Sequence, residues 1–143
     1  MKVKVINRSQ NELPSYQTPL SAGMDLRADL TESVVLRPLE RAMIPTGLHV
    51  EIPEGYEMQI RPRSGLAAKF GITVLNTPGT IDADYRGEIK VILVNLSSND
   101  FEVKNGERIA QAIVARHEKA EWEPTDELTD TSRGEGGFGS TGK

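Results

Sequence analysis

Short stretches in which apolar and polar residues alternate recur along this 143-residue chain, and prolines or glycines separate them. Residues 2–6, 47–52 and 56–61 alternate in this way, which is the pattern of half-buried strands. Residues 88–96 contain the uninterrupted apolar run 91–94 and predict a long, largely buried strand. Residues 108–116 contain enough alanine for a helix, but their β-branched residues favour a strand. We therefore expect an all-β fold: an antiparallel sandwich, a jelly roll or a distorted barrel.

One short segment, residues 64–71, has the features of a helix. Ser64 suits the N-cap, because its hydroxyl could accept a hydrogen bond from a free backbone N–H of the first turn. Gly71 suits the position just past the C-terminus. Pro62 stands just before the segment, so a sharp turn should lead into the helix.

The composition limits the classes of function. Hydrophobic residues make up 37% of the chain, enough for the core of one domain, and the absence of cysteine excludes disulfides, thiolate metal sites and a cysteine nucleophile. The longest aliphatic run, residues 91–94, is far too short for a membrane span. Residues 1–9 lack the apolar block of a signal peptide. The expectation is a cytoplasmic protein with no membrane partner.

The net charge of −4 is unevenly distributed. Acidic and basic residues balance at 14 each over residues 1–116, whereas residues 117–143 carry 7 acidic and 3 basic residues. A polymeric nucleic acid needs a basic stripe and is an unexpected partner, but a small anion could bind at a local cluster. After Trp122 the composition shifts to Glu, Asp, Thr, Ser and Gly. We expect a β-barrel domain over residues 1–122 and an arm or mobile tail over residues 123–143.

The first polar cluster is the run Arg-Pro-Arg-Ser-Gly at residues 61–65. Free backbone N–H groups at the start of a helix, a serine hydroxyl and a guanidinium together suit a phosphate. The alternative is an ordinary capped helix with solvated arginines.

The second cluster occupies residues 76–87, between two apolar stretches, and is expected to be a hairpin with a polar tip. Asp82 and Asp84 would point to the same side of an extended chain. One could activate a water while the other pairs with Arg86, and Tyr85 offers a flat surface for a sugar or base. The alternative is a polar loop with a surface Asp–Arg pair.

The third cluster, residues 133–142, is rich in glycine. Its spacing is similar to that of a phosphate loop, but serine fills the lysine position and no strand or helix flanks it, so that interpretation fails. Its glycines could still wrap an anion while Arg133 adds charge and Phe138 stacks on a base. The alternative is a flexible terminus. With only His49 and His117 available, a carboxylate-activated water and a phosphate-bound divalent ion fit the inventory better than a histidine triad or metal site.

Together and in order, five segments resemble the motifs of the trimeric deoxyuridine triphosphatases (dUTPases). They are residues 22–26, 62–67, 79–87, 108–111 and 133–142. The resemblance implies a homotrimer of jelly-roll subunits with active sites shared among all three. It also implies hydrolysis of dUTP to dUMP and pyrophosphate, which keeps uracil out of DNA and supplies dUMP for dTMP synthesis.

The resemblance assigns roles to individual residues. Asp82 would deprotonate the water that attacks the α-phosphorus, and Tyr85 would exclude the 2′-hydroxyl of UTP. Mg²⁺ would be held chiefly by the phosphates and water, with Asp25 in the outer shell. The uracil would be read by Asn76, Gly79, Thr80, Ile81 and Lys90. The phosphates would be held by Arg63, Ser64, Gly65 and Gln111. The tail would close as a lid through Arg133, Phe138, Gly139, Ser140 and Thr141.

Two alternatives remain open. The related dCTP deaminases share the trimeric fold but lack the Asp82 and Tyr85 hairpin, which disfavours deamination. A nucleotide-binding module without turnover is the other alternative, and the presence of Asp82, Gln111 and the complete tail argues against it.

Overall fold

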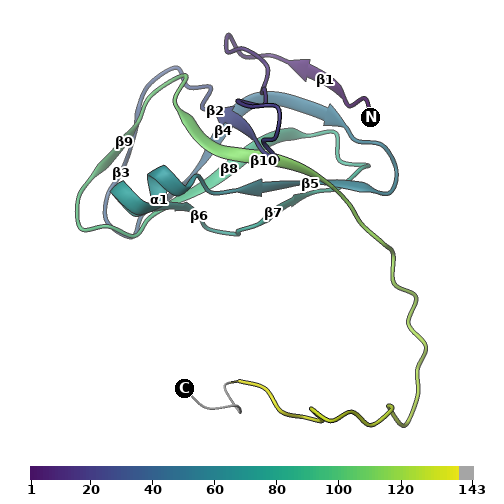
Figure 1. Ribbon diagram of the computed structural model, residues 1–143. Coiled ribbons are helices and arrows are strands. Elements are labelled where there is room, and N and C mark those ends of the chain that lie inside the picture. Colours follow the sequence, from purple (N-terminus) through teal and green to yellow (C-terminus); the bar gives the residue numbers. More distant parts are fainter. Residues whose placement is uncertain (139–143) are drawn as a thin grey trace.

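The computed structural model describes residues 1–138 and consists of antiparallel strands with one short helix (Figure 1). The all-β expectation is confirmed. The strands are β1 (Lys4–Asn7), β2 (Met24–Arg27), β3 (Val34–Leu36), β4 (Arg41–Glu51), β5 (Tyr56–Arg61), β6 (Ile72–Val74), β7 (Gly79–Ile81), β8 (Glu88–Asn95), β9 (Phe101–Val103) and β10 (Arg108–Arg116). The helix α1 (Ser64–Phe70) lies between β5 and β6.

Two four-stranded sheets form the body, in the manner expected of a jelly roll. Their strand orders are β1-β4-β8-β6 and β2-β10-β5-β7, and β3 pairs with β9 in a small third sheet. The alternating side chains of both sheets meet in one apolar core, because every second residue of a strand faces inward. Its most deeply buried members include Leu26, Ile44, Ile60, Val91 and Ala110.

The connection between β6 and β8 differs from a simple hairpin. These strands do pair, with Ile72 opposite Asn95. The segment between them leaves their sheet, however, and residues 79–81 form β7 beside β5 in the other sheet. The polar cluster at residues 76–87 is therefore fixed to both sheets of the body.

Helix α1 begins differently from the sequence expectation. Ser64 is its first residue, the N-cap position is occupied by Arg63 in extended conformation, and no side chain caps the helix. The prediction of a Ser64 cap was wrong because the extended chain runs one residue further, and the carbonyl of Arg63 accepts the N–H groups of Leu66 and Ala67. Gly71 ends the helix in the left-handed conformation, as expected, with φ of 65°.

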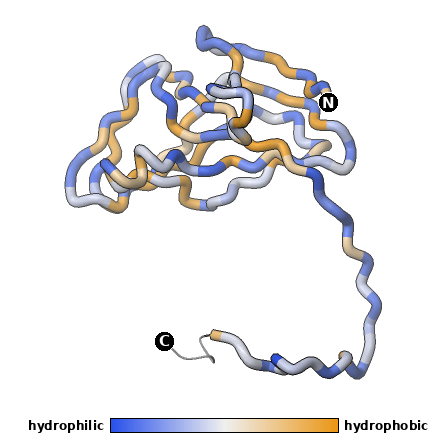
Figure 2. Tube along the Cα trace, viewed as in Figure 1, coloured by the Kyte–Doolittle hydropathy of each residue, from blue (hydrophilic) through white to orange (hydrophobic). Residues whose placement is uncertain are grey.

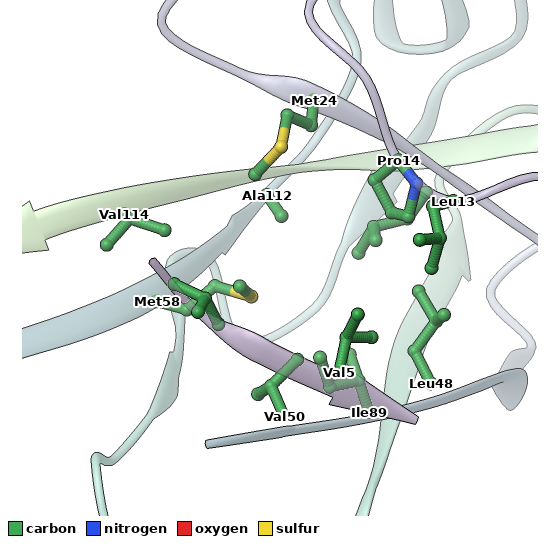
Figure 3. Close-up of a pocket in the computed structure, with 12 residues that line it drawn as sticks. Val5, Leu13, Pro14, Met24, Leu48, Val50, Met58, Ile89, Ala112 and Val114 are labelled. Carbon is green, nitrogen blue, oxygen red and sulfur yellow. The ribbon is translucent and has the colours of Figure 1, made fainter. Parts of the chain in front are cut away.

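An apolar cavity of about 170 Å³ lies beneath β1 (Figure 3). Val5, Leu48, Val50, Met58 and Ile89 are among the residues that line it. The lining is almost entirely hydrocarbon, so this cavity offers no group for nucleotide chemistry. It is separate from the polar clusters that the sequence singles out.

The chain leaves the body after β10. The N–H of His117 donates to the carbonyl of Gly55, and residues 118–138 then run away from the body as a largely hydrophilic tail without helix or strand (Figures 1 and 2). Trp122 and Leu128 in this tail are about nine-tenths exposed. Within residues 1–138, no helix is long and apolar enough to cross a membrane.

Candidate active site

A carboxylate held between two arginines forms the centre of the first cluster. Asp25 in β2 accepts a hydrogen bond at Oδ1 from Nε of Arg63, 3.0 Å away, and at Oδ2 from Nη1 of Arg108, 3.1 Å away. Nη1 of Arg63 also donates to the backbone carbonyl of Arg108 at 3.0 Å. The Asp25 side chain is only 17% exposed. Two guanidiniums against one carboxylate leave this cluster with a net positive charge, which suits an anionic ligand.

Gln111 joins this cluster through the register of the sheet. It lies opposite Asp25 on one side of β10 and opposite Arg61 on the other. Its Nε2 donates to the carbonyl of Pro62 at 3.0 Å. The side chain folds over Gly23, where an added Cβ would collide with Oε1 of Gln111. The amide is therefore held between the start of β2 and the turn before α1.

Ser64 and Gly65 complete the first cluster. Both are exposed in the first turn of α1, where backbone N–H groups have no partner within the helix. They follow Arg63 directly, so these N–H groups, a hydroxyl and a guanidinium lie close together. This combination can hold a phosphate.

The second cluster begins where β7 meets β5. Gly79 lies opposite Ile60 and is buried. A Cβ added to Gly79 would lie 3.3 Å from Cβ of Ile60 and 3.4 Å from Nδ2 of Asn76. The glycine thus allows the Asn76 amide to lie close to the backbone of β7. The peptide bond between Thr77 and Pro78 is cis.

Asp82 and Asp84 lie in a turn rather than in an extended chain. The N–H of Tyr85 donates to the carbonyl of Asp82 at 3.1 Å, which closes the turn. The chain is therefore a turn at this point and not extended as predicted, although both residues line one depression. The suggested pairing with Arg86 also does not form, because Arg86 Nη1 donates to the carbonyls of Ala83 and Tyr85 instead.

A pocket of about 240 Å³ opens beside this turn. Asp82 and Tyr85 line it together with residues from β4, β7 and β8. The full lining is Met43, Thr80, Ile81, Asp82, Tyr85, Glu88, Lys90 and Ile92. Met43, Glu88 and Ile92 were not singled out from the sequence. Ile92 could have been found from the sequence, because Lys90 and Ile92 are two residues apart in one strand and therefore point to the same face.

Asp82 also lines a larger polar depression of about 650 Å³, together with Asp84 and His117. Glu51 also lines it, and a hydrogen bond from Lys4 lowers the pKa of the Glu51 carboxyl. The Glu51 carboxyl is therefore charged near neutral pH, and Asp82 lines both this depression and the smaller pocket.

Strand β5 separates the two clusters within one chain. Asp82 directly follows Ile81, which pairs with Met58, so Asp82 lies beside Glu57 at the start of β5. Arg63 follows the other end of the strand. Six extended residues span about 20 Å. A single nucleotide cannot place one phosphate at Arg63 and the next phosphate at Asp82 of the same chain.

The tail residues lie away from both clusters. Phe138 is fully exposed, and Nε of Arg133 donates to the carbonyl of Gly136 at 2.7 Å. The predicted site residues Gly139, Ser140 and Thr141 lie outside the described residues.

The polar groups of the first cluster fit a metal ion whose ligands are mostly water molecules and the phosphates of a bound nucleotide. Each carboxylate oxygen of Asp25 already accepts one guanidinium hydrogen bond. Among residues 1–138, no group of three His, Cys, Asp or Glu side chains is placed to hold a metal ion. A direct protein cage for Mg²⁺ is therefore not offered by these residues, whereas one water-mediated contact to Asp25 is chemically compatible.

The chain is thus an antiparallel jelly roll that carries a guanidinium-rich cluster and, separately, a small pocket beside a carboxylate. The sequence profile of the dUTPase family matches residues 9–142, and the chain belongs to that family. A deoxyuridine 5′-triphosphate nucleotidohydrolase from Cytophaga hutchinsonii is 62% identical over 141 residues, covering 99% of this chain and 92% of the relative. The Fusobacterium nucleatum protein of the same name is 57% identical over 143 residues, covering 100% of this chain and 98% of that protein.

A solved structure supports the same fold. A G164S mutant of the dUTPase from Staphylococcus bacteriophage 80alpha, with dUpNHpp, superposes with a TM-score of 0.89. The two chains are 28% identical, and the match covers 99% of each. The resemblance noted from the five sequence motifs is confirmed at the level of the family.

Proposed function

We propose that this chain hydrolyses dUTP to dUMP and pyrophosphate in the cytoplasm, which limits uracil in DNA and supplies dUMP for dTMP synthesis. The observation that carries the proposal is that the chain holds both a small pocket beside Asp82 and an anion-binding cluster around Arg63. The names of the similar Cytophaga and Fusobacterium proteins point to the same substrate.

Asp82 is proposed as the general base. It lines the small pocket, and the turn that the Tyr85 N–H closes fixes its backbone. A water held by the carboxylate loses a proton to Asp82 as its oxygen forms a bond to the α-phosphorus. The bond from that phosphorus to the bridging oxygen breaks, and pyrophosphate leaves with the electron pair.

The small pocket is proposed to take uracil and deoxyribose. Asn76 lies against Gly79, so its amide and the backbone of β7 can read the edge of a pyrimidine. Tyr85 offers its ring to the sugar. The remaining residues assigned to the base are Thr80, Ile81 and Lys90, all of which line the pocket.

The first cluster is proposed to hold the phosphates through Arg63, Ser64, Gly65 and Gln111. Its two guanidiniums stabilise the charge that develops on the departing pyrophosphate. Mg²⁺, when bound to the nucleotide, neutralises phosphate charge and favours a compact triphosphate. Asp25 is proposed to hold a water of that ion, and its two oxygens orient Arg63 and Arg108.

We further propose a homotrimer with shared active sites. Asp82 and Arg63 of one chain are about 20 Å apart, too far for one nucleotide to contact both. A single site can contain both residues if one subunit supplies the pocket and another supplies the phosphate cluster. Residues 1–122 form the catalytic β-barrel domain in this proposal, and residues 123–143 form an arm that crosses to a neighbour. Its end closes as a lid through Arg133, Phe138, Gly139, Ser140 and Thr141.

The testing experiment measures pyrophosphate release with Mg²⁺ from dUTP, dTTP, dCTP and UTP. We expect release from dUTP alone, with loss of at least about 10³-fold in Asp82→Asn while dUTP still binds. Asp84→Asn is the matched control, because this carboxylate lies in the same turn but does not line the small pocket. Equal release from all four nucleotides would overturn the substrate. Ammonia from dCTP would indicate a deaminase, and tight dUTP binding without release would indicate a binding module.

A further inference from the structure

Gly87 lies against the ring of Tyr85. A Cβ added to Gly87 would lie 2.8 Å from Cε2 of Tyr85 and closer still to Cζ and the hydroxyl oxygen. Ordinary van der Waals contact begins near 3.4 Å. The ring therefore occupies the space that any side chain at position 87 would need.

Tyr85 is also held by two hydrogen bonds, one from its side chain and one from its backbone. The hydroxyl of Tyr85 donates to the carbonyl of Glu88 at 3.1 Å, and its backbone N–H donates to the carbonyl of Asp82 at 3.1 Å. The side chain is 44% exposed and lines the small pocket. The aromatic ring thus bends back over the backbone of residues 87–88 while bordering the space beside Asp82.

Backbone conformation does not explain the glycine. Gly55 and Gly71 have φ of 81° and 65°, where a side chain is strained, but Gly87 is not among the glycines with positive φ. The Tyr85 ring, and not a positive φ, is therefore what a side chain at position 87 would meet.

We propose that Gly87 is a specificity-determining residue: its missing side chain lets the Tyr85 ring lie low enough to fit a deoxyribose and exclude a ribose. This inference rests on the proposed function, in which Tyr85 contacts the sugar. Gly87 acts through Tyr85 and touches no substrate, so it is a positioning residue. Discrimination between two sugars that differ by one hydroxyl depends on the ring position to within about 1 Å.

The test is Gly87→Ala. The added methyl displaces the ring and separates its hydroxyl from the Glu88 carbonyl. We expect the ratio of kcat/KM for dUTP to kcat/KM for UTP to fall by about 10-fold or more, since a misplaced contact of about 1 Å costs that order. Thermal unfolding and the mass of the assembly check that the variant folds. An unchanged ratio in a folded variant would refute the inference.

A double-mutant cycle separates the proposed route from a general structural effect. In a Tyr85→Ala background the ring is gone, so Gly87→Ala should leave the remaining dUTP-to-UTP ratio within about 2-fold. A further fall of the size seen in the wild-type background would show that Gly87 does not act through Tyr85.

Tyr85→Phe keeps the test decisive if Gly87→Ala does not fold. This variant removes only the hydroxyl that the Glu88 carbonyl holds, so the ring loses one of its two anchors. We expect a fall in the ratio of about 3-fold or more from the loss of one hydrogen bond, and an unchanged ratio would count against the inference. A wild-type protein without preference for dUTP would instead refute the proposed function itself.

Discussion

Arg63 donates from Nε to Oδ1 of Asp25 across 3.0 Å, so a carboxylate from β2 fixes the guanidinium that precedes α1. The second oxygen of the same carboxylate holds Arg108 at 3.1 Å. Three segments far apart in the sequence are tied together by one side chain that is 17% exposed. The proposed phosphate cluster is therefore organised before a ligand arrives, which lowers the cost of binding.

The first prediction concerns the negative charge of Asp25. Asp25→Asn keeps the shape of the side chain but leaves both guanidiniums without a counter-charge. A charge-assisted hydrogen bond contributes about 1.5–3 kcal/mol, so kcat/KM for dUTP should fall about 10- to 100-fold. Steady-state pyrophosphate release measures the effect. Glu102→Gln is the matched control, because its ion pair with Lys104 is exposed and 3.6 Å long. A similar loss in both variants would show that the effect is not specific to the cluster.

The second prediction concerns Mg²⁺. Because no group of three metal-binding side chains occurs within residues 1–138, the metal alone should leave the Tm of the protein unchanged. Mg²⁺ together with a non-hydrolysable dUTP analogue should raise the Tm, and at 100 times the Kd of the analogue the added stability is about 2.7 kcal/mol. Chelation by EDTA should remove most of this increase. A large Tm shift from Mg²⁺ alone would reveal a protein-held metal site and contradict the proposed outer-shell role of Asp25.

The third prediction tests a buried polar residue of the fold. Asn95 is fully buried, and its Nδ2 donates to the carbonyls of Leu36 and Asn99 at 2.8 and 2.7 Å. Asn95→Ala leaves these carbonyls without their donor and should lower the free energy of unfolding by about 3 kcal/mol.

Urea unfolding at fixed protein concentration measures that loss. The control is Asn105→Ala, since the Oδ1 of this exposed residue accepts one hydrogen bond from Leu30 N–H. Its removal should cost about 1 kcal/mol. Equal losses of unfolding free energy in the two variants would mean that the burial of Asn95 does not increase the contribution of its hydrogen bonds to stability.

Much of the fold follows from local sequence patterns. The strands at residues 56–61 and 88–95 are where alternation and an apolar run predict them, because burial of one or both faces fixes these patterns. The cap of α1 was predicted wrongly, since Ser64 has the right chemistry but the extended chain continues through Arg63. Local preference could not show where the strand before the helix ends.

The candidate site was less accessible to the same reasoning. Asp25, Arg63 and Gln111 lie together only because β10 pairs with both β2 and β5, and strand pairing over that distance is not a local signal. Arg108 was noted only as part of the segment 108–111 and was given no role of its own, because its contact with Asp25 depends on this pairing. The turn at Asp82 was mistaken for extended chain because a hydrogen bond from Tyr85 decides its conformation. The five motifs identified the family, while the contacts between them required the structure.

The last prediction tests whether active sites are shared between subunits. Asp82→Asn and Arg63→Ala are each expected to be nearly inactive alone. When equal amounts are unfolded together and refolded, some sites receive Asp82 from one variant and Arg63 from the other. Random assembly gives about one quarter of the sites both intact residues, so activity should recover to about 25% of wild type.

Two controls test whether the recovered activity comes from newly assembled mixed trimers. Simple mixing without unfolding should restore little activity if subunits exchange slowly, and refolding either variant alone should restore none. If both residues acted from the same chain, every site in the mixture would lack one of them and no activity would return. The spacing of about 20 Å along β5 argues for recovery, because one triphosphate cannot reach across it.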